Sequence, residues 1–400
     1  MNRISILRGV LMLLLALVLV STFVPCAQAQ KPGEKPTQTL NVGFLIALTG
    51  PGTLSDMGKE TQVGLTAYLQ DLEAWGGIRV GGQRYMIKPI IYDDKGGDTA
   101  AARDAVNRLI LQDGVKFIGY TLWSPTTIAI SPIIEEHKVL TMGDGGAPEC
   151  VNPKTTYFFR TTSPMTLTGP AMYKWISTNM PNIKRVAIIT NNDAVGRAAL
   201  AAAEQARDKW GFQIVDIGWI TRATTDVSSQ VGKAMARTPD IIDMSCGNPA
   251  LVLKQSREMG YKGLILDYDG WHPMPVIASL GWGPVQNLIS MAVNPDDPML
   301  PKGYADFVRR MHAQGQPGSW WSESMYNGLW ILKQAMEKAN SLNPQEVQKV
   351  MHTMEFDVLS GKGRFVGKES FGIDNQLGLY VYFSMVEGEK YKMLGKIEIK

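Results

Sequence analysis

Metal-binding and disulfide-forming residues are scarce in this chain. Its 400 residues include three cysteines and four histidines. The histidines form no H-E-x-x-H motif and no Cys/His pair with metal-ligand spacing, so we expect no metal site. Cys26 lies in the apolar N-terminal stretch, which leaves Cys150 and Cys246 in the body of the chain. An exported chain permits a disulfide between them, but their wide separation favours two free, buried thiols.

Phosphate-binding motifs are also missing. The loop that begins at Gly50 and Gly52 would need a third glycine at position 55 for a dinucleotide fingerprint, and that position is Ser55. Gly367-Lys368 is followed by a glutamate, which cannot supply the magnesium-binding hydroxyl of a P-loop. The sequence therefore predicts no nucleotide cofactor. The first loop is either an ordinary strand-to-helix turn or a place where the backbone approaches another ligand.

The chain lacks a recognisable catalytic grouping. It has no G-x-S-x-G elbow and no Ser/His/Asp set in a suitable context. Asp93 and Asp94 are adjacent, and neighbouring residues of a strand point to opposite faces, so they make a poor acid–base pair. We expect that the protein is not an enzyme, with an exported hydrolase as the least favoured alternative.

Charge of one sign does not dominate. The chain has 40 Lys and Arg against 37 Asp and Glu, for a net charge of +3. Without a basic stripe, nucleic acid is not an expected partner. No segment after the N-terminal stretch is long and apolar enough to predict a membrane span.

The N-terminus carries an export signal. Arg3 and Arg8 precede an aliphatic run at residues 10–20, and Ala27-Gln28-Ala29 is a small-x-small cleavage site. We predict a signal peptide at residues 1–29, a polar tether at residues 30–39 and a periplasmic mature protein. Lipidation of Cys26 is the less favoured alternative, because Phe23-Val24-Pro25 matches the usual preceding pattern poorly.

Strands and helices alternate through most of the mature chain. Such alternation predicts parallel sheets with helices on both faces, and a chain of this length fits two doubly wound α/β lobes. The expected strands are residues 41–48, 85–92, 116–120, 139–142, 185–190, 213–220, 241–245 and 264–268. The expected helices are residues 57–72, 99–112, 125–136, 196–210, 227–236 and 250–259.

The last quarter of the chain has a different pattern. Helices are expected at residues 303–314, 323–339 and 344–354. Two strands at residues 379–385 and 392–399 then predict a late hairpin.

An ordered set of short segments resembles the leucine/isoleucine/valine-binding protein family. The segments are LTGPGTLSDMG, LEAWGG, YDDKGGDTAAA, GYTLWSPTT, GAPE and FFRTT, and the resemblance covers residues 40–400. It implies a type I periplasmic binding protein, a monomer that delivers a small molecule to an ABC permease and ATPase. It also implies a hinge of three segments, near residues 160–162, 291–294 and 361–372. The lobes would be residues 40–160 with 293–365, and residues 161–292 with 366–400, with the ligand between them.

The segment Leu122-Trp123-Ser124-Pro125 is the first candidate for ligand binding. Ser124 followed by proline predicts a helix N-cap, and a helix N-terminus attracts a carboxylate. By the resemblance, Ser124 anchors the ligand carboxylate. Trp123 either lines the cleft or packs within its lobe, and Leu122 lies beside it.

Three further positions carry the polar part of the expected site. By the resemblance, Asp269 pairs with a ligand ammonium, unless it is a turn aspartate. Gly146 matches a family threonine that binds the amino-acid backbone, so that hydroxyl is missing here. Asp144 either binds an amine or hydroxyl of the ligand or caps a glycine-rich turn.

Other positions that cover the ligand in the family are altered. Val195 stands where a tyrosine is expected, Met57 replaces an aromatic residue, and Trp271 offers a wall or a cation–π face. For the pair Trp320-Trp321, packing at a helix start is favoured over a place at the cleft rim. The expected ligand is a small amphipathic carboxylate, either a hydrophobic amino acid or an aromatic acid. The alternative is a sensor protein for an amide or quaternary amine.

Overall fold

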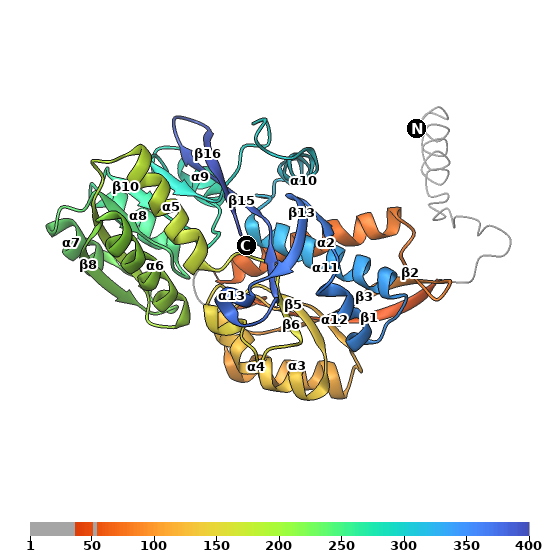
Figure 1. Ribbon diagram of the computed structural model, residues 1–400. Coiled ribbons are helices and arrows are strands. Elements are labelled where there is room, and N and C mark those ends of the chain that lie inside the picture. Colours follow the sequence, from red (N-terminus) through yellow and green to blue (C-terminus); the bar gives the residue numbers. More distant parts are fainter. Residues whose placement is uncertain (1–36, 51–53, 400) are drawn as a thin grey trace, which may run out of the picture. The chain divides into compact units, whose positions relative to one another are not determined.

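The computed structural model describes residues 37–50 and 54–399 (Figure 1). The predicted signal peptide, its cleavage site and Cys26 lie outside these residues. Residues 37–400 form one compact unit that contains two β-sheets. The first strand begins at Gln38, so the last two residues of the predicted tether belong to a sheet. Within the described residues, every helix is too short or too polar to cross a lipid bilayer.

The first sheet has nine strands, and its centre is parallel. From β3 through β1, β4, β5 and β6 to β14, neighbours run in the same direction, with Phe44 of β1 opposite Ile91 of β3. The outer strands β2, β12 and β13 pair antiparallel. In spatial order the strands are β12 (Phe356–Val358), β13 (Gly361–Val366), β14 (Gln376–Gly378), β6 (Phe158–Arg160), β5 (Leu140–Gly143), β4 (Phe117–Tyr120), β1 (Gln38–Ile46), β3 (Gln83–Asp93) and β2 (Ile78–Val80).

The second sheet has seven strands, of which five are parallel. The last two, β15 and β16, form an antiparallel hairpin that joins the sheet through β11. In spatial order the strands are β16 (Tyr391–Glu398), β15 (Tyr380–Val386), β11 (Leu288–Ser290), β10 (Leu264–Leu266), β9 (Ile241–Asp243), β7 (Arg185–Asn191) and β8 (Gln213–Ile220).

Helices cover both faces of the first sheet because its central strands are apolar on both sides. Along β1, Phe44 and Ile46 join the same buried cluster as Leu72 of α2 and Leu332 of α11, whereas Leu45 joins a second cluster on the other face. That second cluster holds the buried side chains of α3 and α4, which lie side by side in Figure 1. These helices are α2 (Leu54–Ala74), α11 (Trp320–Ala339), α3 (Thr99–Leu111) and α4 (Ser124–His137).

The remaining helices come directly before or after strands of the second sheet in the chain, or belong to its last quarter. The first group is α5 (Met165–Asn179), α6 (Ala194–Trp210), α7 (Ser228–Ala236), α8 (Pro249–Glu258) and α9 (Met274–Leu280). The second group is α10 (Lys302–Ala313), α12 (Pro344–Met351) and the short α13 (Lys368–Phe371), and a 3-10 turn lies at Pro148–Cys150.

The predicted fold class is confirmed, with two refinements. Both sheets are mixed rather than wholly parallel, because late strands join each of them antiparallel. The predicted hairpin is present as β15 and β16. Cys150 and Cys246 are buried and free, as expected, and burial raises the pKa of the Cys150 thiol to about 12.

The predicted third passage between the sheets, at residues 361–372, is wrong. The chain changes sheets after Arg160, after Ser290 and at Leu379. Residues 361–366 and 376–378 are strands of the first sheet, so the expected boundary at residue 366 falls too early. The physical reason is a local pairing: β14 adds to β6, where Nε of Arg160 donates to Oε1 of Gln376 over 2.5 Å.

Candidate functional site

The candidate site lies where loops leave the carboxyl ends of parallel strands in both sheets. Trp123 follows β4 and Asp144 follows β5 in the first sheet, while Asp269 follows β10 in the second. A Cβ atom added to Gly146 would lie 4.0 Å from Oδ1 of Asp269, so the two loops approach each other closely. Ligands of open α/β sheets bind at this end of the strands.

Ser124 begins α4, but it is not the N-cap that the sequence predicted. Trp123 takes the cap position, with Pro125 in the first turn. The Ser124 hydroxyl is used elsewhere, because its Oγ accepts a hydrogen bond from the backbone N–H of Ala147 over 3.1 Å. Ser124 is buried, and a hydrogen bond from its side chain also acts to lower the pKa of the Cys150 thiol.

Asp144 is buried and held in a defined orientation. The hydroxyl of Thr162 donates to its Oδ1 over 2.7 Å, and its backbone N–H donates to the carbonyl of Thr121. Burial raises the pKa of Asp144 to about 6, while Thr162, Arg160 and Trp321 act in the opposite direction. A hydrogen bond from the backbone N–H of Gly145 also lowers the pKa of Asp144, so the side chain contacts its own turn as well.

Arg160 fixes the glycine-rich loop that carries Asp144 and Gly146. Its Nη1 donates to the carbonyl oxygens of Gly145 and Ala147, both over 2.9 Å. Arg160 is fully buried. These two hydrogen bonds from the buried guanidinium hold the backbone on either side of Gly146 in place.

Two acidic residues follow β10. Asp267 is fully buried, accepts the backbone N–H of Asp269 over 3.4 Å, and has a buried Oδ2 without a hydrogen-bond partner. Burial raises its pKa to about 8. Asp269 is half-buried, and burial, together with the nearby Asp267 and Asp144, raises its pKa well above the ordinary value. The carboxyl group of Asp267 therefore holds a proton near neutral pH and is able to donate a hydrogen bond, and the raised pKa of Asp269 favours its protonated form.

Arg222 is the basic residue that faces these acids, and the sequence prediction missed it. It follows β8, and its Nε donates to Oδ2 of Asp193 over 3.0 Å. Its guanidinium lies 4.8 Å from the centre of the Trp123 ring. A loop of the second sheet therefore contacts a loop of the first sheet at this point. Arg222 also acts to lower the pKa of both Asp94 and Asp269. The signal available in the sequence was a basic residue directly after a strand.

The tryptophan pair was predicted to pack at a helix start, and it also adjoins the site. Trp320 and Trp321 open α11 and are both buried. A Cβ atom on Gly270, next to Asp269, would come within 2.6 Å of the Trp320 ring. A hydrogen bond from the Trp321 side chain acts to lower the pKa of Asp144. These two residues therefore bound the acidic group from the side of the first sheet.

The other predicted site residues are buried in apolar surroundings. Leu122, Met57, Val195 and Trp271 are at most 5% exposed and belong to the main hydrophobic cluster. Met57 lies inside α2, which begins earlier than expected, at Leu54. Trp271 contributes its backbone N–H to Asp267. The same cluster includes Trp123, Trp320 and Trp321, so these four side chains belong to the apolar surroundings of the site.

The first glycine-containing loop is anchored by Asp93. Its Oδ1 accepts the backbone N–H groups of Leu48 and Thr49, and its Oδ2 accepts the Thr49 hydroxyl over 2.5 Å. Partial burial acts to raise the pKa of Asp93, but the hydrogen bonds from Thr49, Lys95 and Leu48 lower it. Asp94 is instead fully buried, so the side chains of Asp93 and Asp94 lie in different surroundings, as expected for neighbours at a strand end. Residues 51–53 of this loop lie outside the described residues.

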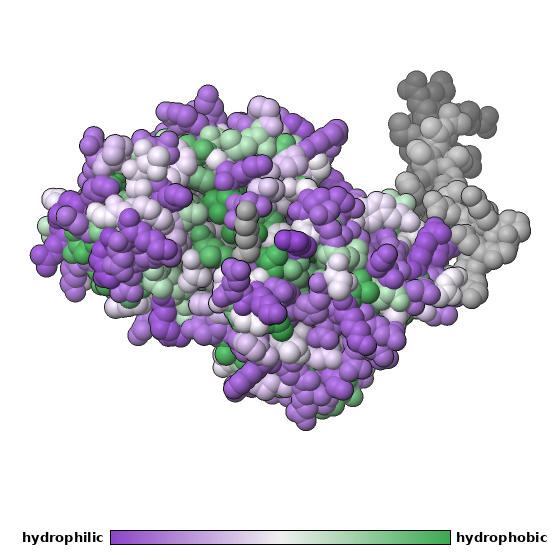
Figure 2. Space-filling view, in the orientation of Figure 1, coloured by the Kyte–Doolittle hydropathy of each residue, from purple (hydrophilic) through white to green (hydrophobic). Residues whose placement is uncertain are grey.

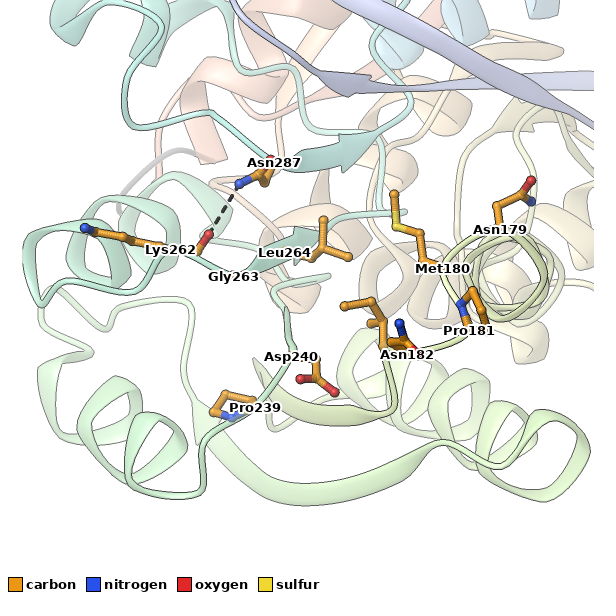
Figure 3. A pocket seen from close by; sticks show the side chains of 11 residues that line it. Asn179, Met180, Pro181, Asn182, Pro239, Asp240, Lys262, Gly263, Leu264 and Asn287 are labelled. Carbon is orange, nitrogen blue, oxygen red and sulfur yellow. Dashed lines mark hydrogen bonds between the residues drawn. The ribbon is translucent and has the colours of Figure 1, made fainter.

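A separate surface pocket of about 600 Å³ lies far from these groups (Figure 3). Its lining includes Asp240, Leu264 and Asn287, which stand at the amino ends of β9, β10 and β11. Asp240 is already engaged, because its Oδ2 accepts the backbone N–H groups of Lys184 and Arg185. We therefore place the candidate site at the opposite, carboxyl ends of the strands. In Figure 2, hydrophilic residues cover most of the visible face and hydrophobic ones gather near its centre.

Comparisons with known proteins identify the family and the fold. The periplasmic binding protein family matches residues 39–390. The Leu/Ile/Val/Thr-binding protein of Salmonella typhimurium is 24% identical, over 84% of this chain and 90% of that protein.

Solved structures share the fold at low identity. A solute binding protein of an ABC transporter from Rhodopseudomonas palustris, in complex with 3,4-dihydroxybenzoic acid, has a TM-score of 0.76 at 19% identity, covering 90% of this chain and 97% of that one. A branched-chain amino acid transporter substrate binding protein from Streptococcus pneumoniae, in complex with isoleucine, has a TM-score of 0.73 at 18% identity, covering 90% and 99%. The family match spans most of the chain, and the protein belongs to the periplasmic binding protein family.

Proposed function

We propose that this protein is the extracytoplasmic substrate-binding component of an ABC importer. It binds a small amphipathic carboxylate between its two lobes and delivers it to a membrane permease driven by an ATPase. No bond of the ligand is made or broken. The protein acts in the periplasm as a monomer.

The observation that carries this proposal is the meeting of buried carboxyl groups from both sheets with the guanidinium of Arg222. Asp144 stands at the end of the first sheet, and Asp269 and Arg222 stand at the end of the second. A ligand with an acid group and an amine or hydroxyl group fits such a pair of poles, and charge-assisted hydrogen bonds in a buried site are strong.

The ligand class follows from the site together with the relatives. The relatives named above are described as binding leucine, isoleucine, valine and threonine, and the two solved structures hold isoleucine and 3,4-dihydroxybenzoic acid. We propose that this chain takes either a hydrophobic amino acid or an aromatic hydroxy acid. The missing hydroxyl at Gly146 favours the aromatic acid, and the acidic residue at Asp269 suits either an ammonium or a phenolic hydroxyl.

A cationic ligand is the second candidate, in a transporter or in a sensor. Asp144, Asp267 and Asp269 are three carboxyl groups in one small region, with pKa values raised by burial. A quaternary amine would favour their ionised forms and would gain from the adjacent aromatic rings of Trp123 and Trp321.

A thermal-shift screen of the mature protein separates these ligand classes. The panel contains isoleucine, leucine, 3,4-dihydroxybenzoate, 4-hydroxybenzoate, benzamide and glycine betaine. Ligand that binds only the folded protein raises Tm, by a free energy of about 2.7 kcal/mol when its concentration is 100 times Kd. We expect a shift with an amino acid or an aromatic acid. A shift with betaine alone favours the cationic alternative, and no shift with any compound contradicts the proposal.

A further inference from the structure

Arg222 occupies an unusual position for a charged side chain. It extends from the loop after β8, is tied to Asp193 at one nitrogen, and lies over the Trp123 ring. Its Nη1 and Nη2 atoms are both buried and have no hydrogen-bond partner in the described residues. A guanidinium offers five N–H donors, and leaving buried donors unfilled is costly.

Two more hydrogen-bond donors without an acceptor lie near the Arg222 guanidinium. Trp123 is 5% exposed, and its Nε1 is buried without a partner. Asn191 is 1% exposed, and its Nδ2 is likewise buried and unfilled.

Gly247 joins the guanidinium to this asparagine. A Cβ atom added to Gly247 would lie 2.9 Å from Nη1 of Arg222 and 3.3 Å from Oδ1 of Asn191. The guanidinium therefore lies against backbone that carries no side chain. Oδ1 of Asn191 accepts the backbone N–H of Gly247 over 2.5 Å.

These donors define an anion-binding position. We propose that Arg222 binds the carboxylate of the transported ligand through its Nη1 and Nη2 atoms and determines the preference of the site for acids. This inference rests on the proposed function and identifies Arg222 as the residue that recognises the acid group of the ligand. The planar fork of a guanidinium matches the two oxygens of a carboxylate.

The surroundings favour a single negative charge. Asp193 is bonded to the guanidinium, and Asp94 and Asp269 interact with it electrostatically. A carboxylate fills the donors and adds one charge, whereas a dianion such as a phosphate ester would be repelled by these acids. Because Arg222 also lies over Trp123 of the first sheet, the acid group binds where the two lobes touch.

Paired probes test this role. Isothermal titration is carried out with isoleucine, leucine, 4-hydroxybenzoate and 3,4-dihydroxybenzoate, and with the primary amide of each. The proteins are the wild type, Arg222→Gln, Arg222→Lys and Arg197→Gln. Arg197 is an exposed arginine of α6 in the same lobe, so its replacement makes the same change in net charge at a solvent-exposed position. Thermal melts of the ligand-free variants report on folding.

We expect the wild type to bind at least one acid in preference to its amide. In Arg222→Gln the affinity for that acid falls between about tenfold and about a hundredfold, while the affinity for the amide changes little, so the preference disappears. Arg222→Lys keeps the charge but not the fork and is intermediate, and Arg197→Gln resembles the wild type.

The failures of the two proposals are distinguishable. If the wild type binds an acid and folded Arg222→Gln still prefers that acid over its amide, Arg222 is not the acid-binding residue, although the proposed function stands. If the wild type binds none of the eight compounds, both the proposed ligand class and this inference are wrong. If Arg222→Gln fails to fold, folded Arg222→Lys decides the matter, and an unchanged acid preference there overturns the role of the fork.

Discussion

Gly146 of the first lobe faces Asp269 of the second, with 4.0 Å between the position of an added Cβ atom and Oδ1 of the carboxyl group. The other neighbours of that position are Cγ and Sδ of Met165, at 3.4 and 3.7 Å. These are ordinary van der Waals distances, so a side chain at residue 146 has room and points toward the acidic group.

Gly146→Thr should therefore fold normally and change ligand selectivity. We expect the free energy of unfolding to change by less than about 1 kcal/mol. The new hydroxyl would restore the group that family members use for an amino-acid backbone, so the affinity for isoleucine should rise relative to 3,4-dihydroxybenzoate. Isothermal titration with the two ligands measures the ratio.

Gly143→Ala is the matched control for steric fit. A Cβ atom there would lie 2.6 Å from the carbonyl oxygen of Thr121, which is backbone and cannot rotate away. We expect a loss of about 1–3 kcal/mol in urea melts. Equal stability of the two variants would contradict this account of the loop.

Ser124→Ala should reduce stability as well as affinity. The resemblance assigns Ser124 to the ligand carboxylate, but its hydroxyl also accepts the N–H of Ala147. Removing it leaves a buried donor unpaired, at a cost of about 1–3 kcal/mol. Urea melts should show this loss, while Ser131→Ala, whose hydroxyl only bonds the carbonyl of Thr127, should show little. Equal melts for the two variants would mean that the Ala147 contact contributes nothing.

Asp267→Asn should stabilise the protein at high pH. Burial raises the Asp267 pKa to about 8, whereas the unfolded chain titrates near its ordinary value of about 3.9. Between these values the folded state binds a proton that the unfolded state has released, so this residue makes stability fall as pH rises from about 4 to about 8. Asparagine removes that dependence.

Urea melts at pH 5 and pH 8 test the sign. The gain of Asp267→Asn over the wild type should be larger at pH 8, on the order of a few kcal/mol. Asp226 is a suitable comparison, because it is exposed and a hydrogen bond from Ser228 lowers its pKa. Asp226→Asn should lose a little stability at both pH values, and a gain of Asp267→Asn that shrinks at pH 8 would contradict the prediction.

The pH dependence of affinity should distinguish the two ligand classes. An ammonium at Asp269 requires an ionised carboxyl, and the pKa of that group is raised in the free protein. Binding of isoleucine therefore releases a proton, and its affinity should rise with pH until the carboxyl group of the free protein is itself ionised, by at most about tenfold per pH unit. The affinity for 3,4-dihydroxybenzoate should stay level or fall, because a protonated carboxyl can donate to the ligand. Titration in buffers of different ionisation enthalpy counts the protons.

Much of the fold was predictable because the apolar patterns are local. The strand at residues 213–220 and the helix that ends at Trp210 were predicted with bounds close to those observed. The short strands β6, β12, β13 and β14 were not predicted, and neither was α5. A strand of three residues such as Phe158–Arg160 carries no periodicity of its own and exists because its neighbours in the sheet supply hydrogen-bond partners.

The sequence pointed to only part of the candidate site. The resemblance led to Asp144, Gly146 and Asp269, and the structure brings these three together. Arg222 was missed because its position depends on Trp123, a residue in the other sheet. The apolar candidates Met57, Val195 and Trp271 were chosen from family positions, and burial in the core cannot be told from burial at a cleft by residue type alone.

The place of β14 between β13 and β6 has a consequence for the order in which the chain acquires structure. The first sheet needs residues 376–378 to cover the edge of β6, and it needs α11 to cover one face. A nascent chain that ends before Ala339 lacks part of α11, so one face of these apolar strands is left only partly covered by α2. The N-terminal lobe therefore cannot finish folding as it emerges, and contacts between distant segments slow folding further. Nearly the whole polypeptide must be made before the first lobe closes.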